Sequence, residues 1–115
     1  MSNQNDMAER KQTILIVDDF MVNRALLADM LGNEYDIIEA ANGVEAVVAM
    51  RDLGSRISLI LLDIVMPEMD GLEVLAMMNK QGWIKEIPVI MVSSESTSST
   101  IERAYNLGVI DFISR

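Results

Sequence analysis

The chain has 115 residues, of which 50% are hydrophobic and 23% are charged. That length fits one domain, and that balance supports a buried core and argues against a disordered chain or a coiled-coil rod. The 18 acidic and 9 basic side chains give a formal net charge of -9, which disfavours binding to nucleic acid or to an anionic membrane. The chain has no cysteine and no histidine, so disulfides, thiolate chemistry and histidine-based sites are excluded and any chemistry must use oxygen ligands.

The first segment of the chain, residues 1–12, is polar and has no clear hydrophobic period. This pattern predicts a flexible leader, with a short helical turn as the alternative. The segment lacks the hydrophobic core of a signal peptide, and the apolar runs of the chain are much shorter than a membrane span. We therefore expect a cytoplasmic protein whose folded domain covers residues 13–115.

Five segments are predicted to be strands. Three are apolar runs in which Ser58 is the one polar residue, and their nearly continuous hydrophobicity is typical of parallel strands that are covered on both faces. Two further segments have weaker strand patterns. In chain order the five are Ile14–Val17, Tyr35–Ala40, Ile57–Leu62, Val89–Val92 and Val109–Ile113.

Helical patterns separate these strands, and three of them begin with a capping residue that is followed three positions later by Glu. The capping pairs are Asn42 with Glu45, Asp70 with Glu73, and Ser99 with Glu102. The predicted helices are Val22–Leu31, Val44–Leu53, Leu72–Lys80 and Thr100–Leu107. Because right-handed crossovers turn such an alternation into a parallel sheet with helices on both faces, the sequence predicts a doubly wound α/β fold.

Acidic residues follow two of the predicted strands. Asp18 and Asp19 follow the first strand and Asp63 follows the third, and ligands of open α/β sheets bind at the carboxyl ends of the strands. Any one of these acids alone is better explained as a helix cap or a solvated side chain. Three together repel one another unless a cation neutralises them, and a hard cation such as Mg²⁺ prefers oxygen ligands. We therefore expect a magnesium site at this edge.

A carboxylate beside Mg²⁺ can also attack phosphorus when a hydroxyl and a cation stabilise the charge on the phosphoryl oxygens. Ser93 follows the fourth strand and Arg115 follows the fifth, so both are expected at the same edge. Taken alone, each is better explained as a loop serine or a solvated arginine. Asn23 and Arg24, at the start of the first helix, are expected on a solvated face although they lie close to the acids.

Four motifs resemble the receiver domains of two-component response regulators. They are Ile14–Asp19 (ILIVDD), Leu61–Gly71 (LLDIVMPEMDG), Pro88–Ser94 (PVIMVSS) and Gly108–Arg115 (GVIDFISR). They occur in the order that the family requires and together span nearly the whole chain after residue 12. The resemblance implies a flavodoxin-like five-stranded sheet with the strand order 2-1-3-4-5.

The resemblance also implies a role for each site residue. Asp63 is the phosphoacceptor, Ser93 is the switch hydroxyl, and Phe112 is the aromatic rotamer switch. Asp19 is a direct ligand of Mg²⁺, Asp18 holds a metal-bound water molecule, the backbone carbonyl of Val65 supplies another oxygen, and Asp63 belongs to the same metal site. The phosphoryl donor is a sensor histidine kinase or a phosphotransfer protein.

Two features depart from the family pattern. Arg115 occupies the position where the family has lysine, and arginine keeps the positive charge but is larger and planar. The sequence also ends before the last helix of the fold. From this we expect a piece cut from a longer protein that has an output domain, with an exposed flank on the fifth strand that invites aggregation, domain swapping or a homodimer.

Three functions remain open from the sequence. The first is a phosphorylation-dependent signalling switch that is not an enzyme and promotes only its own phosphorylation and dephosphorylation. The second is a receiver-like interaction module that is not phosphorylated, which Arg115 favours and the acids disfavour. The third is a Mg²⁺-dependent phosphatase of the haloacid dehalogenase type, which is disfavoured because such enzymes have a second acid where this chain has Val65.

Overall fold

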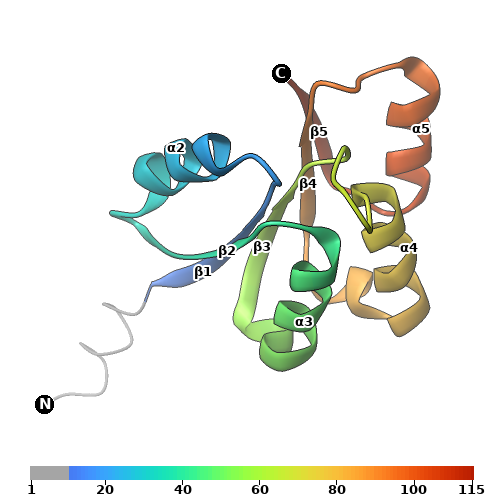
Figure 1. Ribbon diagram of the computed structural model, residues 1–115. Coiled ribbons are helices and arrows are strands. Elements are labelled where there is room, and N and C mark those ends of the chain that lie inside the picture. Colours follow the sequence, from blue (N-terminus) through green and yellow to red (C-terminus); the bar gives the residue numbers. More distant parts are fainter. Residues whose placement is uncertain (1–10) are drawn as a thin grey trace, which may run out of the picture.

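The structure is a computed structural model that describes residues 11–115. Within these residues a single parallel sheet forms, with the strand order β2-β1-β3-β4-β5 (Figure 1). The strands are β1 (Gln12–Val17), β2 (Tyr35–Ala40), β3 (Ile57–Leu62), β4 (Val89–Ser93) and β5 (Asp111–Ser114). The predicted doubly wound sheet and its order are confirmed.

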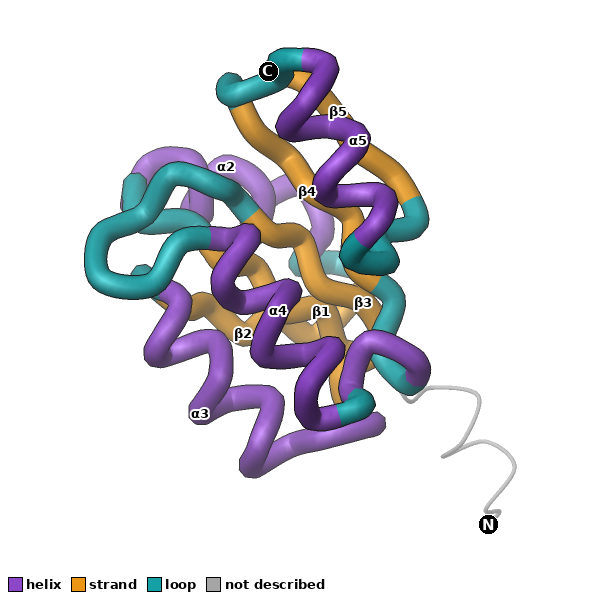
Figure 2. Tube along the Cα trace, turned by 90° about the vertical axis from the view of Figure 1, so that its right-hand side faces the viewer, coloured by secondary structure: helices purple, strands orange, loops and turns teal. Residues whose placement is uncertain are grey.

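Four α-helices connect the strands, and two 3₁₀ turns precede β3 and β4. The helices are α2 (Met21–Leu31), α3 (Gly43–Leu53), α4 (Gly71–Gln81) and α5 (Ser98–Asn106), and the turns are η1 (Gly54–Arg56) and η2 (Trp83–Lys85). Figures 1 and 2 show that α3, α4 and α5 lie on one face of the sheet and α2 on the other. Within residues 11–115 no helix follows β5, so α2 is the one helix on its face.

The main core lies between the sheet and the three helices on its crowded face. Alternate residues of β3 and β4 point into it, and this alternation explains why Ile60, Leu62 and Met91 are fully buried. Val74 and Met78 of α4 close the core from the helix side. On the other face the side chains near β5 are less covered: Ile113 is 48% exposed. The sheet edge at β5 is therefore open on the side of α2.

Two of the three predicted capping pairs are correct. The side chain of Asn42 accepts a hydrogen bond from the Glu45 amide, and Asp70 and Glu73 form a reciprocal capping box. The prediction of Ser99 as a cap is wrong, because α5 begins at Ser98 and Thr97 accepts the capping hydrogen bond.

The element boundaries differ from the predicted ones by at most two residues, and those of β2 and β3 are as predicted. Shifts of two residues occur at the starts of β1, α5 and β5, and β5 begins at Asp111 rather than Val109. The predicted leader, residues 1–12, lies outside the described residues except for Lys11 and Gln12, and Gln12 is the first residue of β1. Among the described residues, none of the helices has both the length and the hydrophobicity that crossing a membrane requires.

Candidate functional site

The three predicted acids lie together at the carboxyl ends of β1 and β3. The Asp18 amide donates to the Ala40 carbonyl at 3.1 Å and the Asp63 amide donates to the Val17 carbonyl at 2.9 Å. These bonds continue the sheet ladder by one residue and bring the first loop residues side by side. One carboxylate oxygen from each of Asp18, Asp19 and Asp63 lies within 4.8 Å of the others. The expected convergence of the acids is therefore observed.

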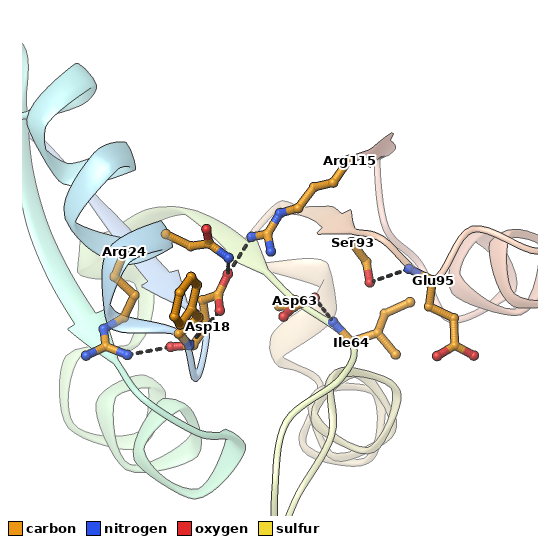
Figure 3. Close-up of polar contacts among 9 residues, drawn as sticks. Asp18, Arg24, Asp63, Ile64, Ser93, Glu95 and Arg115 are labelled. Carbon is orange, nitrogen blue, oxygen red and sulfur yellow. Dashed lines mark hydrogen bonds and ion pairs between the residues drawn. The ribbon is translucent and has the colours of Figure 1, made fainter.

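Asp18 is the most constrained of the three acids. Its side chain is 2% exposed. Oδ1 accepts a hydrogen bond from the Phe20 amide at 2.9 Å. Oδ2 accepts one from Asn23 Nδ2 at 3.3 Å and also forms an ion pair with the Arg115 guanidinium (Figure 3). The Asp18 carboxylate is thus held by Phe20 and Asn23, which follow it closely in the chain, and by the distant Arg115.

Asp63 is buried beside Asp18, whereas Asp19 is exposed to solvent. Burial raises the pKa of Asp63 above its usual value, and repulsion by Asp18 adds to the rise. The hydrogen bond from the Ile64 amide to Oδ1, the Arg115 charge and the Ser93 hydroxyl lower this pKa again, by smaller amounts. A cation that bound here would relieve this electrostatic strain.

The loop after Asp63 is held tightly against the end of β3. The Gly71 amide donates to the Ile64 carbonyl at 2.8 Å. A Cβ atom at Gly71 would lie 2.2 Å from the Asp63 carbonyl oxygen, so no larger residue fits there without moving the backbone. Val65, whose carbonyl is a predicted ligand, lies on this loop with a side chain that is 55% exposed. The loop therefore holds the backbone of Asp63 in place, while Val65 on the same loop stays exposed to solvent.

Ser93 and Arg115 lie at the ends of β4 and β5, at the same edge as the acids. The Arg115 amide donates to the Ser93 carbonyl at 3.0 Å, and this bond extends the pairing of the two strands. Ser93 is fully buried, and its Oγ accepts a hydrogen bond from the Glu95 amide at 3.2 Å. Figure 3 shows the Arg115 side chain extending from its strand toward Asp18, with Asp63 and Ser93 nearby.

Phe112, the predicted aromatic switch, is half-buried on β5. It is paired in register with Met91 and packs against the main core. Phe112 therefore lies beside Met91, which precedes Ser93 by two residues on β4. It does not lie at the sheet edge that carries the three acids. The rotameric exchange predicted for it stays a prediction.

Arg24 has a role at the site that its sequence pattern does not predict. This side chain was expected on a solvated face, but its Nη1 donates to the Asp18 carbonyl oxygen at 2.7 Å and its Nε contacts Glu39 Oε1 at 3.1 Å. The one available signal was its proximity to the acids along the chain. A main-chain carbonyl leaves no trace in a sequence pattern, so the partner was not visible.

The residues present fit a hard divalent cation. Three carboxylates crowd together, and burial, with repulsion by Asp18 added to it, raises the pKa of Asp63. A bound cation stabilises carboxylates in such an environment. All the candidate donors are oxygen atoms, as Mg²⁺ prefers. The groups that would hold it are Asp18, Asp19, Asp63 and the carbonyl of Val65.

Comparisons with known proteins give one consistent family. The family model described as the response regulator receiver domain matches residues 14–115. The two-component response regulator ORR5 of Oryza sativa subsp. japonica is 33% identical over 100 residues, which cover 87% of this chain and 75% of that protein. The two-component response regulator-like protein APRR7 of Arabidopsis thaliana is 29% identical over 101 residues, which cover 87% of this chain. The chain spans only 14% of the length of APRR7.

Solved structures give the same result. The phosphorylated cyanobacterial phytochrome response regulator RcpA is similar with a TM-score of 0.83 and 30% identity, over 91% of this chain and 81% of that chain. CheY from Borrelia burgdorferi, solved in a complex with CheX, BeF3 and Mg²⁺, is similar with a TM-score of 0.81 and 30% identity. That match covers 96% of this chain and 82% of the matched chain.

Proposed function

The chain belongs to the response regulator receiver domain family, and from this premise we propose that it is a phosphorylation-operated switch whose phosphoacceptor is Asp63. The observation that carries the proposal is the position of Asp63: a buried carboxylate next to two further acids, with Ser93 and Arg115 at the same edge. The phosphorylated state of the relative RcpA supports it.

The proposed chemistry is a phosphoryl transfer to a carboxylate oxygen of Asp63. The donor is a phosphohistidine of a sensor histidine kinase or of a phosphotransfer protein. A bond forms between the Asp63 oxygen and phosphorus while the bond between phosphorus and the histidine nitrogen breaks, and its electron pair stays on the imidazole. Mg²⁺ held by Asp18, Asp19, Asp63 and the Val65 carbonyl would supply positive charge that stabilises the phosphoryl oxygens, and the Mg²⁺ in the solved CheY complex supports that choice of metal.

The chain's own residues then bind the product. The Ser93 hydroxyl, whose Oγ accepts from the Glu95 amide, turns to donate to a phosphoryl oxygen. The Arg115 guanidinium exchanges part of its contact with Asp18 for the phosphoryl group. These contacts exist only when Asp63 is phosphorylated, so they shift the population of conformers, and Phe112 repacks inward as the loop after β4 closes. A partner reads the change on α5 and β5.

The signalling context is part of the same proposal. The domain acts in the cytoplasm as a signalling module, and its phosphorylation controls an output domain or a separate partner. Its place within a longer protein is supported by relatives such as APRR7, in which the matched region is a small fraction of the chain. A homodimer at the open β5 flank is a further expectation, and neither nucleic acid nor a membrane is a direct partner of this acidic domain.

The alternative is a receiver-like interaction module that is not phosphorylated. One observation favours it: Arg115 stands where the family has lysine, and it already occupies Asp18 through an ion pair. An arginine that remained there would keep the cation and the phosphoryl group out.

The test is incubation with Mg²⁺ and acetyl phosphate, followed by intact mass measurement. We expect the mass of one phosphoryl group on the native chain and none on Asp63→Asn. The matched control is Asp29→Asn, an exposed acid on α2 that should leave labelling unchanged. No labelling of the native chain would favour the interaction module, and labelling of Asp63→Asn would place the acceptor elsewhere.

A further inference from the structure

We propose that Arg24 is a positioning residue for the acidic site, because it fixes the peptide group that joins Asp18 to Asp19. The proposal rests on the function proposed above, in which both acids hold the cation. Arg24 contacts neither carboxylate in this role. It contacts the peptide group between Asp18 and Asp19.

The Arg24 side chain connects three elements through one guanidinium group. It starts from the first turn of α2, its Nη1 donates to the Asp18 carbonyl oxygen at 2.7 Å, and its Nε contacts Glu39 of β2 at 3.1 Å. The side chain is only 14% exposed, whereas Glu39 is 43% exposed. Figure 3 shows Arg24 on the far side of Asp18 from Arg115, so the two arginines approach the same residue from opposite sides.

The carbonyl that Arg24 binds belongs to the peptide plane between the two acids. Asp18 donates its own amide to Ala40, which fixes the chain on the side of β1. The hydrogen bond from Arg24 fixes the chain on the side of Asp19, because it holds the peptide plane between Asp18 and Asp19. Rotation of this plane changes the direction in which the Asp19 carboxylate leaves the backbone.

Asp19 is the acid that most needs such support. Asp18 is buried and held by Phe20, Asn23 and Arg115 through its carboxylate oxygens. Asp63 is held by the Ile64 amide. Asp19 is exposed, and within residues 11–115 no hydrogen bond to its carboxylate occurs. Its orientation therefore depends on the backbone from which it projects, and Arg24 controls that backbone.

Two features argue that the bond to the Asp18 carbonyl matters more than the ion pair with Glu39. Glu39 is partly exposed, and exposed ion pairs contribute little because water and salt screen them. The carbonyl bond is shorter and comes from a charged donor, which makes it the stronger contact. Arg24 thus acts on the site chiefly through the main chain.

The experiment is isothermal titration with Mg²⁺ alone on the native chain and on four variants. Arg24→Ala removes both contacts, and Arg24→Lys keeps a charge that reaches one acceptor at a time. Glu39→Gln keeps an acceptor for Nε but removes the ion pair. Arg56→Ala is the matched control, because Arg56 also donates to backbone carbonyls, those of Asp52 and Leu53, at the opposite end of the strands.

We expect Arg24→Ala to weaken Mg²⁺ binding about tenfold, as is typical for residues that orient metal ligands. Arg24→Lys should recover part of the loss, while Glu39→Gln and Arg56→Ala should bind like the native chain. The amide chemical shifts of Asp19 in the metal-free protein should move in Arg24→Ala and stay in place in Arg56→Ala. Circular dichroism confirms that each variant is folded before titration.

The outcomes separate the inference from the function on which it rests. If the native chain fails to bind Mg²⁺, the proposed function is wrong. If the native chain binds and Arg24→Ala binds equally well, the positioning role is wrong and the function stands. A loss in Glu39→Gln as large as that in Arg24→Ala would overturn the inference too, because the tie between α2 and β2 would then be the important contact.

Discussion

The guanidinium of Arg115 forms an ion pair with the carboxylate of Asp18, which lies 97 residues earlier in the chain. The Asp18 side chain is 2% exposed and that of Arg115 is 29% exposed. Arg115 is therefore a cation at the place where the acids crowd together, and it offsets part of their repulsion. Any divalent cation at this site shares Asp18 with it.

Replacement of Arg115 by alanine should destabilise the metal-free protein and should matter less when Mg²⁺ is bound. Removal of one partner of a fully buried ion pair costs about 3–5 kcal/mol. Because Arg115 is partly exposed, we expect a smaller loss in the free energy of unfolding, about 1–2 kcal/mol. Urea unfolding in EDTA and in saturating Mg²⁺ measures both values, and the difference between the proteins should narrow with Mg²⁺.

Arg115→Lys is the control for this prediction, since it keeps the charge and loses only the planar geometry. It should lose less stability than Arg115→Ala. A loss in Arg115→Ala that stays the same with and without Mg²⁺ would show that Arg115 and the cation do not share Asp18.

Asp63 should make the stability of the metal-free protein depend on pH in the direction opposite to an ordinary paired carboxylate. Its pKa is raised in the folded state, above about 3.9 in the unfolded chain. Its contribution is therefore fully present below the unfolded pKa and is lost as the pH rises through the folded pKa. At neutral pH the charge of Asp63 costs stability.

Asp63→Asn should consequently melt at a higher temperature than the native chain in EDTA at neutral pH, and the difference should shrink as the pH falls through the raised pKa. Thermal unfolding over this pH range measures it. Asp29→Asn, at an exposed position on α2, should not change the pH dependence. A native chain that is as stable as Asp63→Asn throughout would contradict the raised pKa of Asp63, which burial and then repulsion by Asp18 cause.

Asp19→Asn should separate metal binding from folding. The Asp19 side chain is exposed, so its replacement should change the metal-free free energy of unfolding by no more than about 0.5 kcal/mol. Mg²⁺ at about 100 times its dissociation constant should stabilise the native chain by about 2.7 kcal/mol. At the same concentration Asp19→Asn should lose most of this gain. An equal Mg²⁺ effect in both proteins would remove Asp19 from the ligands.

The acids could be predicted from the sequence because their positions follow from the fold. The buried runs before Asp18 and Asp63 predict parallel strands, and the carboxyl ends of such strands share one edge. Ser93 and Arg115 follow from the same rule. The rule needs only the apolar runs that mark the strands and the residue that follows each run. Both can be recognised within a short segment of sequence.

The features that could not be predicted depend on contacts that leave no local pattern. Arg24 binds a main-chain carbonyl, which every residue carries. The start of α5 was misplaced because Thr97, Ser98 and Ser99 can all act as caps, and only the backbone geometry selects Thr97. The apolar pattern at Val109 predicted a strand, but this residue still closes the turn after α5 with a hydrogen bond to the Ala104 carbonyl.

Gly71→Ala should disturb the phosphoacceptor through the backbone alone. The new Cβ would lie 2.2 Å from the Asp63 carbonyl oxygen and 2.9 Å from Ile64 Cα, and backbone atoms cannot move away as a flexible side chain can. We expect a loss of about 1–3 kcal/mol in the free energy of unfolding, weaker Mg²⁺ binding and slower labelling by acetyl phosphate. Gly82→Ala is the control: its Cβ would meet nothing within 4 Å, but its φ of 79° is unfavourable for alanine. It should cost about 1–2 kcal/mol and leave Mg²⁺ binding intact, whereas native-like binding in Gly71→Ala would show that this close approach does not position Asp63.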